Sequence, residues 1–141
     1  MDRNNPHQVI RLPDGASIVP SGSASAHPLR SGYGNSDRLV EGGPDSLTVS
    51  RVTLDAGTPQ GPFHIHERAE NTYLVLAGRL DVVTSDETYT LAPGDAIFIP
   101  PGVAHATHDP WPEPATFLAI YDRSTVGDFI RVDQVESEGR A

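Results

Sequence analysis

From residue 47 onward the chain is built of short runs of β-branched, aromatic and aliphatic residues, and each run ends at a cluster of turn-forming residues. Turn signals such as Pro93-Gly94-Asp95 and Pro100-Pro101-Gly102 interrupt the chain, and no long segment keeps the 3.6-residue period of a helix. Strands at such close spacing are typical of an all-β sandwich or barrel. The expected strands are residues 47–54, 63–66, 72–76, 80–84, 88–91, 96–99, 105–108 and 115–121.

The length of 141 residues suits a single domain with one modest core. Residues 1–45 contain many Gly, Pro, Ser and Asn residues, and we interpret them as an extended N-terminal arm of the same domain with one or two short strands. Residues 46–125 form the predicted barrel. Residues 126–141 form a predicted C-terminal tail, and we expect its acidic stretch, residues 133–138, to face solvent.

The composition excludes several functions. Nineteen acidic residues against ten basic ones give a net charge of −9, which repels the phosphate backbone of nucleic acids. All ten basic residues are Arg and no Cys is present, so Schiff-base chemistry on Lys and all thiolate chemistry are excluded. No apolar stretch reaches the roughly 18–20 residues that a membrane-spanning helix needs. Because the N-terminus has no apolar run of signal-peptide length, we expect a cytoplasmic protein.

Three of the six histidines form a pattern that suits a metal ion. His64 and His66 are two residues apart in an extended segment, so both imidazoles leave the same face of the strand. Imidazole nitrogen atoms bind transition metals at about 2.0–2.1 Å, and a third ligand must then come from another strand. His105 is the best candidate, because it begins the strand that follows the Pro-Pro-Gly turn.

The turns around these histidines carry a family resemblance. Residues 94–105, from Gly94 to His105, resemble the second sequence motif of the cupin superfamily at every spacing, with Asp109 where the family usually has Asn. Residues 57–78 resemble the first motif, and Gly78 and Gly94 are expected at hairpin turns with positive φ. The resemblance implies a single cupin jelly-roll barrel with one divalent transition metal. Iron is the favoured ion, with zinc, nickel or manganese as alternatives.

The first cupin motif normally supplies a carboxylate ligand, and here its position is ambiguous. Counting back from Gly78 gives Asn71, whereas counting forward from the histidines gives Glu70. A shift of one residue on a strand moves a side chain to the opposite face, so only one of the two can point inward without a bulge. We favour Asn71 inside, because the turn at Gly78 fixes the strand. The expected metal ligands are His64, His66, Asn71 and His105, with Glu70 in place of Asn71 if the register is shifted.

A neutral ligand set leaves the full charge of a divalent ion uncancelled, which favours an anionic or chelating small-molecule substrate. Without an inward carboxylate, an enzyme would need another base, and a metal-bound hydroxide, Tyr73, Tyr121 and Asp109 are the candidates. The resemblance implies three functions. We favour an Fe(II)-type oxygenase, because three-histidine iron sites occur among cupin dioxygenases. The alternatives are a non-redox cyclase, isomerase or lyase similar to cupin polyketide cyclases, and a non-catalytic metabolite-binding cupin. Small cupins commonly exchange an N-terminal strand, so we expect a homodimer.

Overall fold

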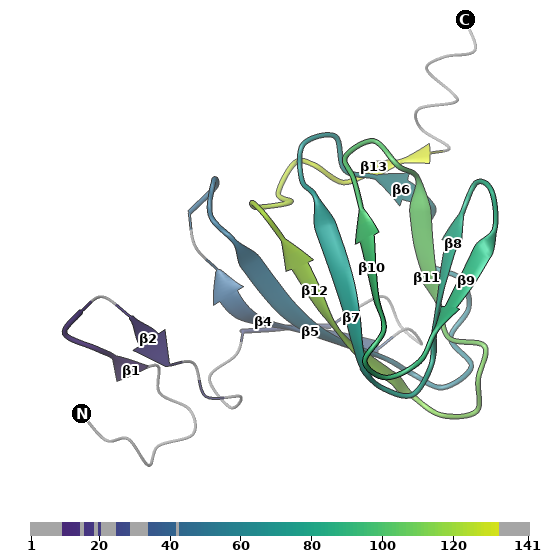
Figure 1. Cartoon of the computed structure of the whole chain (residues 1–141), viewed down its shortest axis with the longest axis horizontal. Helices are drawn as coiled ribbons and strands as arrows, with labels where there is room; N and C mark the ends of the chain where they lie inside the picture. Colours follow the sequence, from purple (N-terminus) through teal and green to yellow (C-terminus); the bar gives the residue numbers. More distant parts are fainter. Residues whose placement is uncertain are drawn as a thin grey trace, which may run out of the picture.

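The chain folds into two antiparallel sheets that face each other (Figure 1). The computed structural model describes residues 10–14, 16–18, 20, 25–28, 34–41 and 43–132. In these residues the strands are β1 (Ile10–Arg11), β2 (Ser17–Ile18), β3 (Ser25–Pro28), β4 (Gly34–Glu41), β5 (Thr48–Leu54), β6 (His64–Ile65), β7 (Asn71–Ala77), β8 (Leu80–Thr84), β9 (Thr88–Leu91), β10 (Ala96–Ile99), β11 (His105–His108), β12 (Ala115–Tyr121) and β13 (Ile130–Arg131).

One sheet has six strands in the order β10-β7-β12-β5-β4-β3, and the other has five in the order β13-β6-β11-β8-β9. Strands β1 and β2 pair only with each other, and Figure 1 shows this hairpin to one side of the two sheets. The all-β fold class predicted from the sequence is confirmed. Five predicted strands have the observed bounds, and the other three differ by one residue at one or both ends.

Three strands join the sheets from outside the predicted barrel: β3 and β4 come from the N-terminal arm, for which we expected only one or two short strands, and β13 comes from the C-terminal tail. Strand β4, which we assigned to the N-terminal arm, pairs with β5 along its length. Strand β13, which we assigned to the C-terminal tail, pairs with β6, so that Ile130 lies opposite Ile65. The acidic stretch of residues 133–138 and the first nine residues of the predicted arm lie outside the described residues.

The turns at Gly78 and Gly94 have the predicted positive φ, of 72° and 90°, but they are not hairpins. Each connects a strand of one sheet to a strand of the other, because β7 and β10 belong to the six-stranded sheet whereas β8 and β9 belong to the five-stranded one. The prediction of hairpins was wrong for this reason: turn chemistry reveals a tight reversal but not which sheet the next strand joins.

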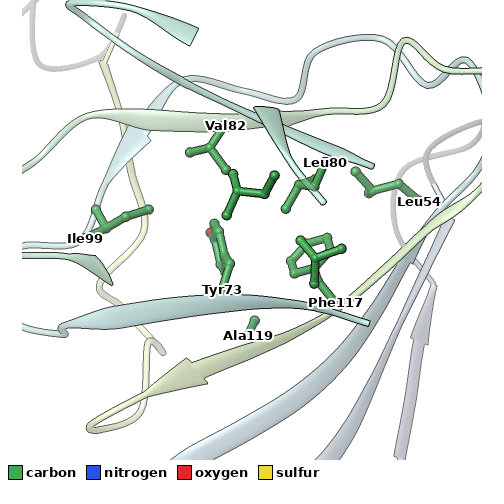
Figure 2. Close-up of a cluster of buried hydrophobic side chains, with 9 residues drawn as sticks. Leu54, Tyr73, Leu80, Val82, Ile99, Phe117 and Ala119 are labelled. Carbon is green, nitrogen blue, oxygen red and sulfur yellow. The ribbon is translucent and has the colours of Figure 1, made fainter. Parts of the chain in front are cut away.

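The core lies between the two sheets. Strand β12 buries Ala115, Phe117 and Ala119 on its inner face, and β7 does the same with Tyr73 and Val75, as the two-residue period of a strand requires. Figure 2 shows the ring of Tyr73 among the other side chains of this cluster. The cluster comprises Leu54, Tyr73, Val75, Leu80, Val82, Leu91, Ile99, Phe117 and Ala119, and β4 contributes no residue to it. None of the described residues forms a helix long and apolar enough to cross a membrane.

Gly78 provides a test of the corner between the sheets. A Cβ atom at this position would overlap the carbonyl oxygen of Pro114, whereas a Cβ atom at Gly94 would have no neighbour within 4 Å. We therefore expect Gly78→Ala to lower the free energy of unfolding by at least about 2 kcal/mol, because strain and overlap add. Gly94→Ala should cost about 1 kcal/mol, the cost of the positive φ alone. Urea unfolding of both variants measures the difference, and equal losses would contradict the overlap.

Candidate metal centre

The five-stranded sheet places two of the three histidines directly opposite each other. His105, the first residue of β11, pairs with His64, the first residue of β6. Directly opposed residues of an antiparallel pair present their side chains on the same face with Cβ atoms about 4.5–5.5 Å apart. His66 follows two residues after His64, and its carbonyl oxygen accepts a hydrogen bond from the Gly102 N–H at 2.7 Å. This hydrogen bond from the Pro-Pro-Gly turn therefore holds the backbone of His66 next to β11, the strand that begins with His105.

Each imidazole is oriented by a backbone carbonyl. The Nδ1 atoms of His64, His66 and His105 lie 2.8, 2.6 and 2.9 Å from carbonyl oxygens. Those oxygens belong to Pro62, Asp128 and Val103, respectively. A carbonyl oxygen can only accept, so each Nδ1 must carry the proton and donate it. A neutral imidazole has one N–H, and Nε2 of each ring is therefore left with an unprotonated lone pair.

The three histidines form a group that could hold a metal ion, because one ring nitrogen of each lies within 4.8 Å of those of the other two. Their ring centroids are 4.4–5.6 Å apart. His105 is fully buried and His66 is 4% exposed, and the Nε2 atom of each has no hydrogen-bond partner. A buried acceptor without a partner is costly. A divalent ion would satisfy both, so the residues fit the metal that the resemblance implies.

The electrostatic setting keeps these rings neutral. Burial is the main reason that the pKa of His64 is lowered to about 3; the bond to Pro62 opposes this shift, and the neighbouring His105 and His66 add smaller contributions in the lowering direction. Burial also lowers the pKa of His66 and of His105. Because an imidazole must be deprotonated to bind a metal, the site is prepared for one at neutral pH.

Tyr73 and Tyr121 lie beside the triad. The Tyr121 ring is 5.5 Å from that of His66, and the Tyr73 ring is 6.1 Å from that of His105, both edge to face. Burial raises the pKa of both hydroxyl groups, that of Tyr73 well above its ordinary value with a further contribution from Tyr121. Both phenols are therefore protonated in the metal-free protein at neutral pH.

The two candidates for the fourth ligand point in opposite directions. Asn71 is 2% exposed on the inner face of β7, where its side chain interacts with the hydroxyl groups of Tyr73 and Tyr121, but neither its amide nitrogen nor its oxygen has a partner at full hydrogen-bond geometry. Glu70 is exposed, and its backbone bonds to Asp122 on the outside. Asn71 pairs with Tyr121 across the sheet, so its amide shares the interior with that residue. A buried amide without such partners needs a ligand or ordered water to satisfy it.

Asp109, the third candidate residue for the base, is at the other end of β11. It lies four residues after His105, which is about 13 Å along an extended strand. Its carboxylate is buried and accepts the Trp111 N–H at 3.0 Å, and its backbone bridges to Thr58. Asp109 therefore holds the loops at the end of the barrel that is distant from the histidines.

Sequence analysis missed Asp128, which we had placed in the predicted tail. It is 1% exposed, and its carboxylate accepts the backbone N–H groups of three consecutive residues, Glu67, Arg68 and Ala69, at 2.7–3.3 Å. Burial opposes ionisation, but these bonds and the Arg68 charge lower the pKa of Asp128. The backbone carbonyl oxygen of Asp128 also accepts a hydrogen bond from the Nδ1–H group of His66. One residue thus fixes both the loop after His66 and the ring of His66.

Sequence analysis also missed Phe129, because we had placed it in the predicted tail as well. Its ring stacks on His64, with centroids 4.1 Å apart and planes 20° apart, although the residue is 49% exposed. The turn signal Val126-Gly127-Asp128 before the apolar pair Phe129-Ile130 could have indicated a further strand here, since Gly127 has a φ of 73°.

Asp128→Asn tests the anchoring of His66. The amide group keeps the shape but puts a donor against backbone donors, so we expect the loop and ring to lose their fixed position. Outer partners of ligating histidines typically contribute 10- to 100-fold to metal affinity, and a loss of about tenfold is expected here. Competition titration with Zn²⁺ measures it. Asp122→Asn is the matched control, because Asp122 also accepts a backbone N–H, that of Glu70, without touching the triad. Equal affinity of both variants would contradict the assigned role.

Comparisons with known proteins agree with this geometry. The sequence profile of the cupin domain matches residues 50–121. Dimethylsulfoniopropionate lyase DddQ of Ruegeria pomeroyi is 42% identical over 73 residues, which are 49% of this chain and 35% of that protein. Its crystal structure has a TM-score of 0.60 at 30% identity and covers 75% of this chain and 59% of that one.

Two further proteins are similar over part of their length. A sugar phosphate isomerase from Silicibacter pomeroyi has a TM-score of 0.55 at 26% identity, over 63% of this chain and 60% of that one. Mannose-1-phosphate guanylyltransferase RfbM of Salmonella typhimurium is 34% identical over 98 residues, 68% of this chain. The chain spans 20% of RfbM and 35% of DddQ, so it corresponds to only a part of these relatives. The matched profile, the two facing sheets and the three-histidine group together show that this chain belongs to the cupin family.

Proposed function

We propose that this protein is a metal-dependent enzyme of the non-redox class. It removes a proton from the carbon next to a carbonyl or carboxylate group of a small anionic substrate, as lyases and isomerases do. The observation that carries the proposal is the convergence of three unprotonated imidazole nitrogen atoms beside the buried Tyr73 and the half-buried Tyr121. With a metal bound, such a site would combine a positive centre with proton-carrying groups inside an apolar barrel.

The relatives support this class over the oxygenase that we favoured from the sequence. Two of the similar proteins are a lyase and a sugar phosphate isomerase, and neither name describes a redox reaction. None of the relatives named above is described as an oxygenase, and they favour the non-redox alternative, so we do not retain the oxygenase interpretation. The homodimer and the cytoplasmic location stay predictions from the sequence.

We assign metal binding to His64, His66 and His105, with Asn71 as the fourth ligand. When bound, a divalent ion supplies Lewis-acid charge that stabilises negative charge on a substrate oxygen. Imidazole and amide ligands suit zinc, nickel, iron and manganese. Elemental analysis of protein purified without a metal-affinity tag identifies the ion.

Tyr121 is our candidate for proton transfer. Its side chain is half-buried and lines a cavity that reaches the surface, so a substrate can contact it. Tyr73 is 4% exposed inside the core, and its hydroxyl interacts with that of Tyr121, so we assign it a positioning role. Burial keeps both hydroxyls protonated without a cation nearby. A positive charge beside Tyr121 would lower its pKa and allow it to accept a proton as well as donate one.

Proton exchange with solvent tests the proposed reaction class. The metal-loaded protein is incubated in D₂O with a panel of small carboxylates and sugar phosphates, including dimethylsulfoniopropionate, and followed by ¹H NMR. We expect loss of a C–H signal next to a carbonyl or carboxylate group, without consumption of O₂. Oxygen consumption coupled to turnover would restore the oxygenase. Binding of panel compounds without exchange would make this a metabolite-binding cupin and would overturn the proposal.

Substitution of the tyrosines tests their separate roles. We expect Tyr121→Phe to lower kcat by about 10²–10⁴-fold with metal affinity unchanged, because it removes the proton carrier but no ligand. Tyr73→Phe should have a smaller effect, together with a shifted pH profile, since it only removes a partner of the Tyr121 hydroxyl. Tyr89→Phe, on an exposed part of β9, is the control and should leave kcat unchanged. A full rate in Tyr121→Phe would remove Tyr121 from the mechanism.

The fourth ligand is tested by an isosteric change. Asn71→Asp keeps the shape of the side chain and adds a negative charge opposite a divalent ion, so we expect Zn²⁺ affinity to rise by about tenfold or more. Glu70→Gln removes an exposed charge and should leave the affinity within about twofold. If Glu70→Gln weakens binding instead, the solution structure has the other strand register and Glu70 is the ligand.

A further inference from the structure

A cavity of about 670 Å³ lies against the inner face of the six-stranded sheet, on its β4-β5-β12 side. The volume is within the range of about 300–1,000 Å³ that is usual for small-molecule sites. Its lining comprises Ser36, Arg38, Gly43, Pro44, Asp45 and residues of β5, β12 and the loops at 68 and 123–126. Because β4 adds nothing to the core cluster, this part of the sheet is not closed by the facing one. Figure 1 shows β4 on the side of the six-stranded sheet away from β10.

The floor of the cavity leads from β4 towards the candidate metal centre. Arg38 pairs with Ser50, Ser50 with Ala119, and Ala119 with Tyr73, so that the four residues form one row across β4, β5, β12 and β7. Paired residues share a face. The two middle side chains, those of Ser50 and Ala119, are short. They leave space above the sheet between the guanidinium group of Arg38 at one end of the row and Tyr73 at the other. Three strand spacings separate the ends, or about 14 Å.

Three of the ten arginines of the chain line this one cavity, and they come from separate parts of the sequence: Arg38, Arg68 and Arg123. Asp45 is the acidic residue of the lining. The side chains of Arg68 and Arg123 are 62% and 42% exposed. The first lies 4.0 Å from Asp128 and the second 3.2 Å from Asp122, but a guanidinium group has five N–H donors, so each retains donors for a ligand.

The same residues are connected to the metal centre through the chain. Arg68 follows His66 by two residues, and Arg123 follows Tyr121 by two residues. Tyr121 itself lines the cavity and contacts His66 ring to ring. A ligand in the cavity can therefore touch both the arginines and the proposed proton carrier.

We propose that this cavity is the subsite for an anionic group of the substrate, a phosphate or a carboxylate, held by Arg38, Arg68 and Arg123. This rests on the proposed function, and it specifies the substrate as one with its anionic group remote from the carbon that reacts. Guanidinium groups bind phosphate and carboxylate oxygens through paired N–H donors. The hydroxyl groups of Thr48, Ser50 and Thr125 supply further donors in the lining. The chain has a net charge of −9, which repels anions overall. The positive charges of the three arginines make the cavity a place where an anion is attracted instead.

The test uses the full-length protein without metal, labelled with ¹⁵N and titrated with inorganic phosphate or with malonate at constant ionic strength. We expect the amide signals of Ser50, Arg68 and Arg123 to shift with a Kd of about 1 mM. Arg38→Gln should weaken binding by about tenfold or more. Arg51→Gln is the matched control: Arg51 is on the same strand as Ser50 but on the opposite face, paired with Asp37, and its loss should change Kd by less than about twofold.

The two anions distinguish the sources of the negative group, since binding of phosphate alone indicates a phosphorylated substrate, and binding of malonate indicates a carboxylate. Arg123→Gln repeats the test if Arg38→Gln disturbs the pairing of β4 with β5. Absence of shifts at these amides with both anions would overturn the proposal, as would an equal loss in Arg51→Gln. Because the titration is made without metal, its failure leaves the proposed function untouched. Conversely, anion binding in a protein that retains no metal would refute the proposed function and leave the subsite in place.

Discussion

Three hydrogen bonds from imidazole to backbone determine what this site can do. The Nδ1–H group of each histidine in the triad donates a hydrogen bond to a carbonyl oxygen. The lone pair of Nε2 in each ring is therefore the one that is available to a metal. Without these bonds the rings could rotate or protonate, and a buried cluster of three histidines would be only a source of instability. The carbonyls belong to Pro62, Val103 and Asp128, which lie in three different connections between strands. The chemistry of the centre therefore depends on loops held in place by the sheets.

The sheets hold these loops through a small number of contacts. Strand β6 has only two residues, and it remains in position because β11 pairs with it on one side and β13 on the other. The carboxylate of Asp128 strengthens this arrangement, because it accepts hydrogen bonds from three consecutive backbone N–H groups. Tyr121 both contacts His66 and lines the arginine-rich cavity, so this residue connects the candidate metal centre to the proposed anion subsite.

Much of the barrel could be predicted from the sequence, because local rules determine it. The Gly and Pro turns delimit the strands, and the two-residue period assigns Tyr73, Phe117 and Ala119 to the interior. The same period places Asn71 inside and Glu70 outside, once Gly78 fixes the strand. The destination of each strand after a turn was not predictable in this way, and two corners between sheets were mistaken for hairpins.

The residues that position the histidines and those that line the cavity could not be predicted, because their roles depend on contacts between residues distant in sequence. Asp128, for example, is hydrogen-bonded to His66, which lies 62 residues earlier in the sequence. The arginines of the cavity come from β4, from the loop after β6 and from the segment after β12, and only the folded sheets bring them together. A single Asp or Arg in a polar stretch carries no signal of such a role, since most of these residues face solvent.

X-ray absorption spectroscopy of the protein loaded with one equivalent of Zn²⁺ tests the central claim most directly, because it counts the imidazole ligands of the ion. The account predicts three histidine nitrogen atoms at about 2.0–2.1 Å, with the multiple scattering that imidazole rings give. A spectrum with one imidazole or none, or a protein that retains no metal after dialysis, would show that the three rings do not act together and would contradict the account.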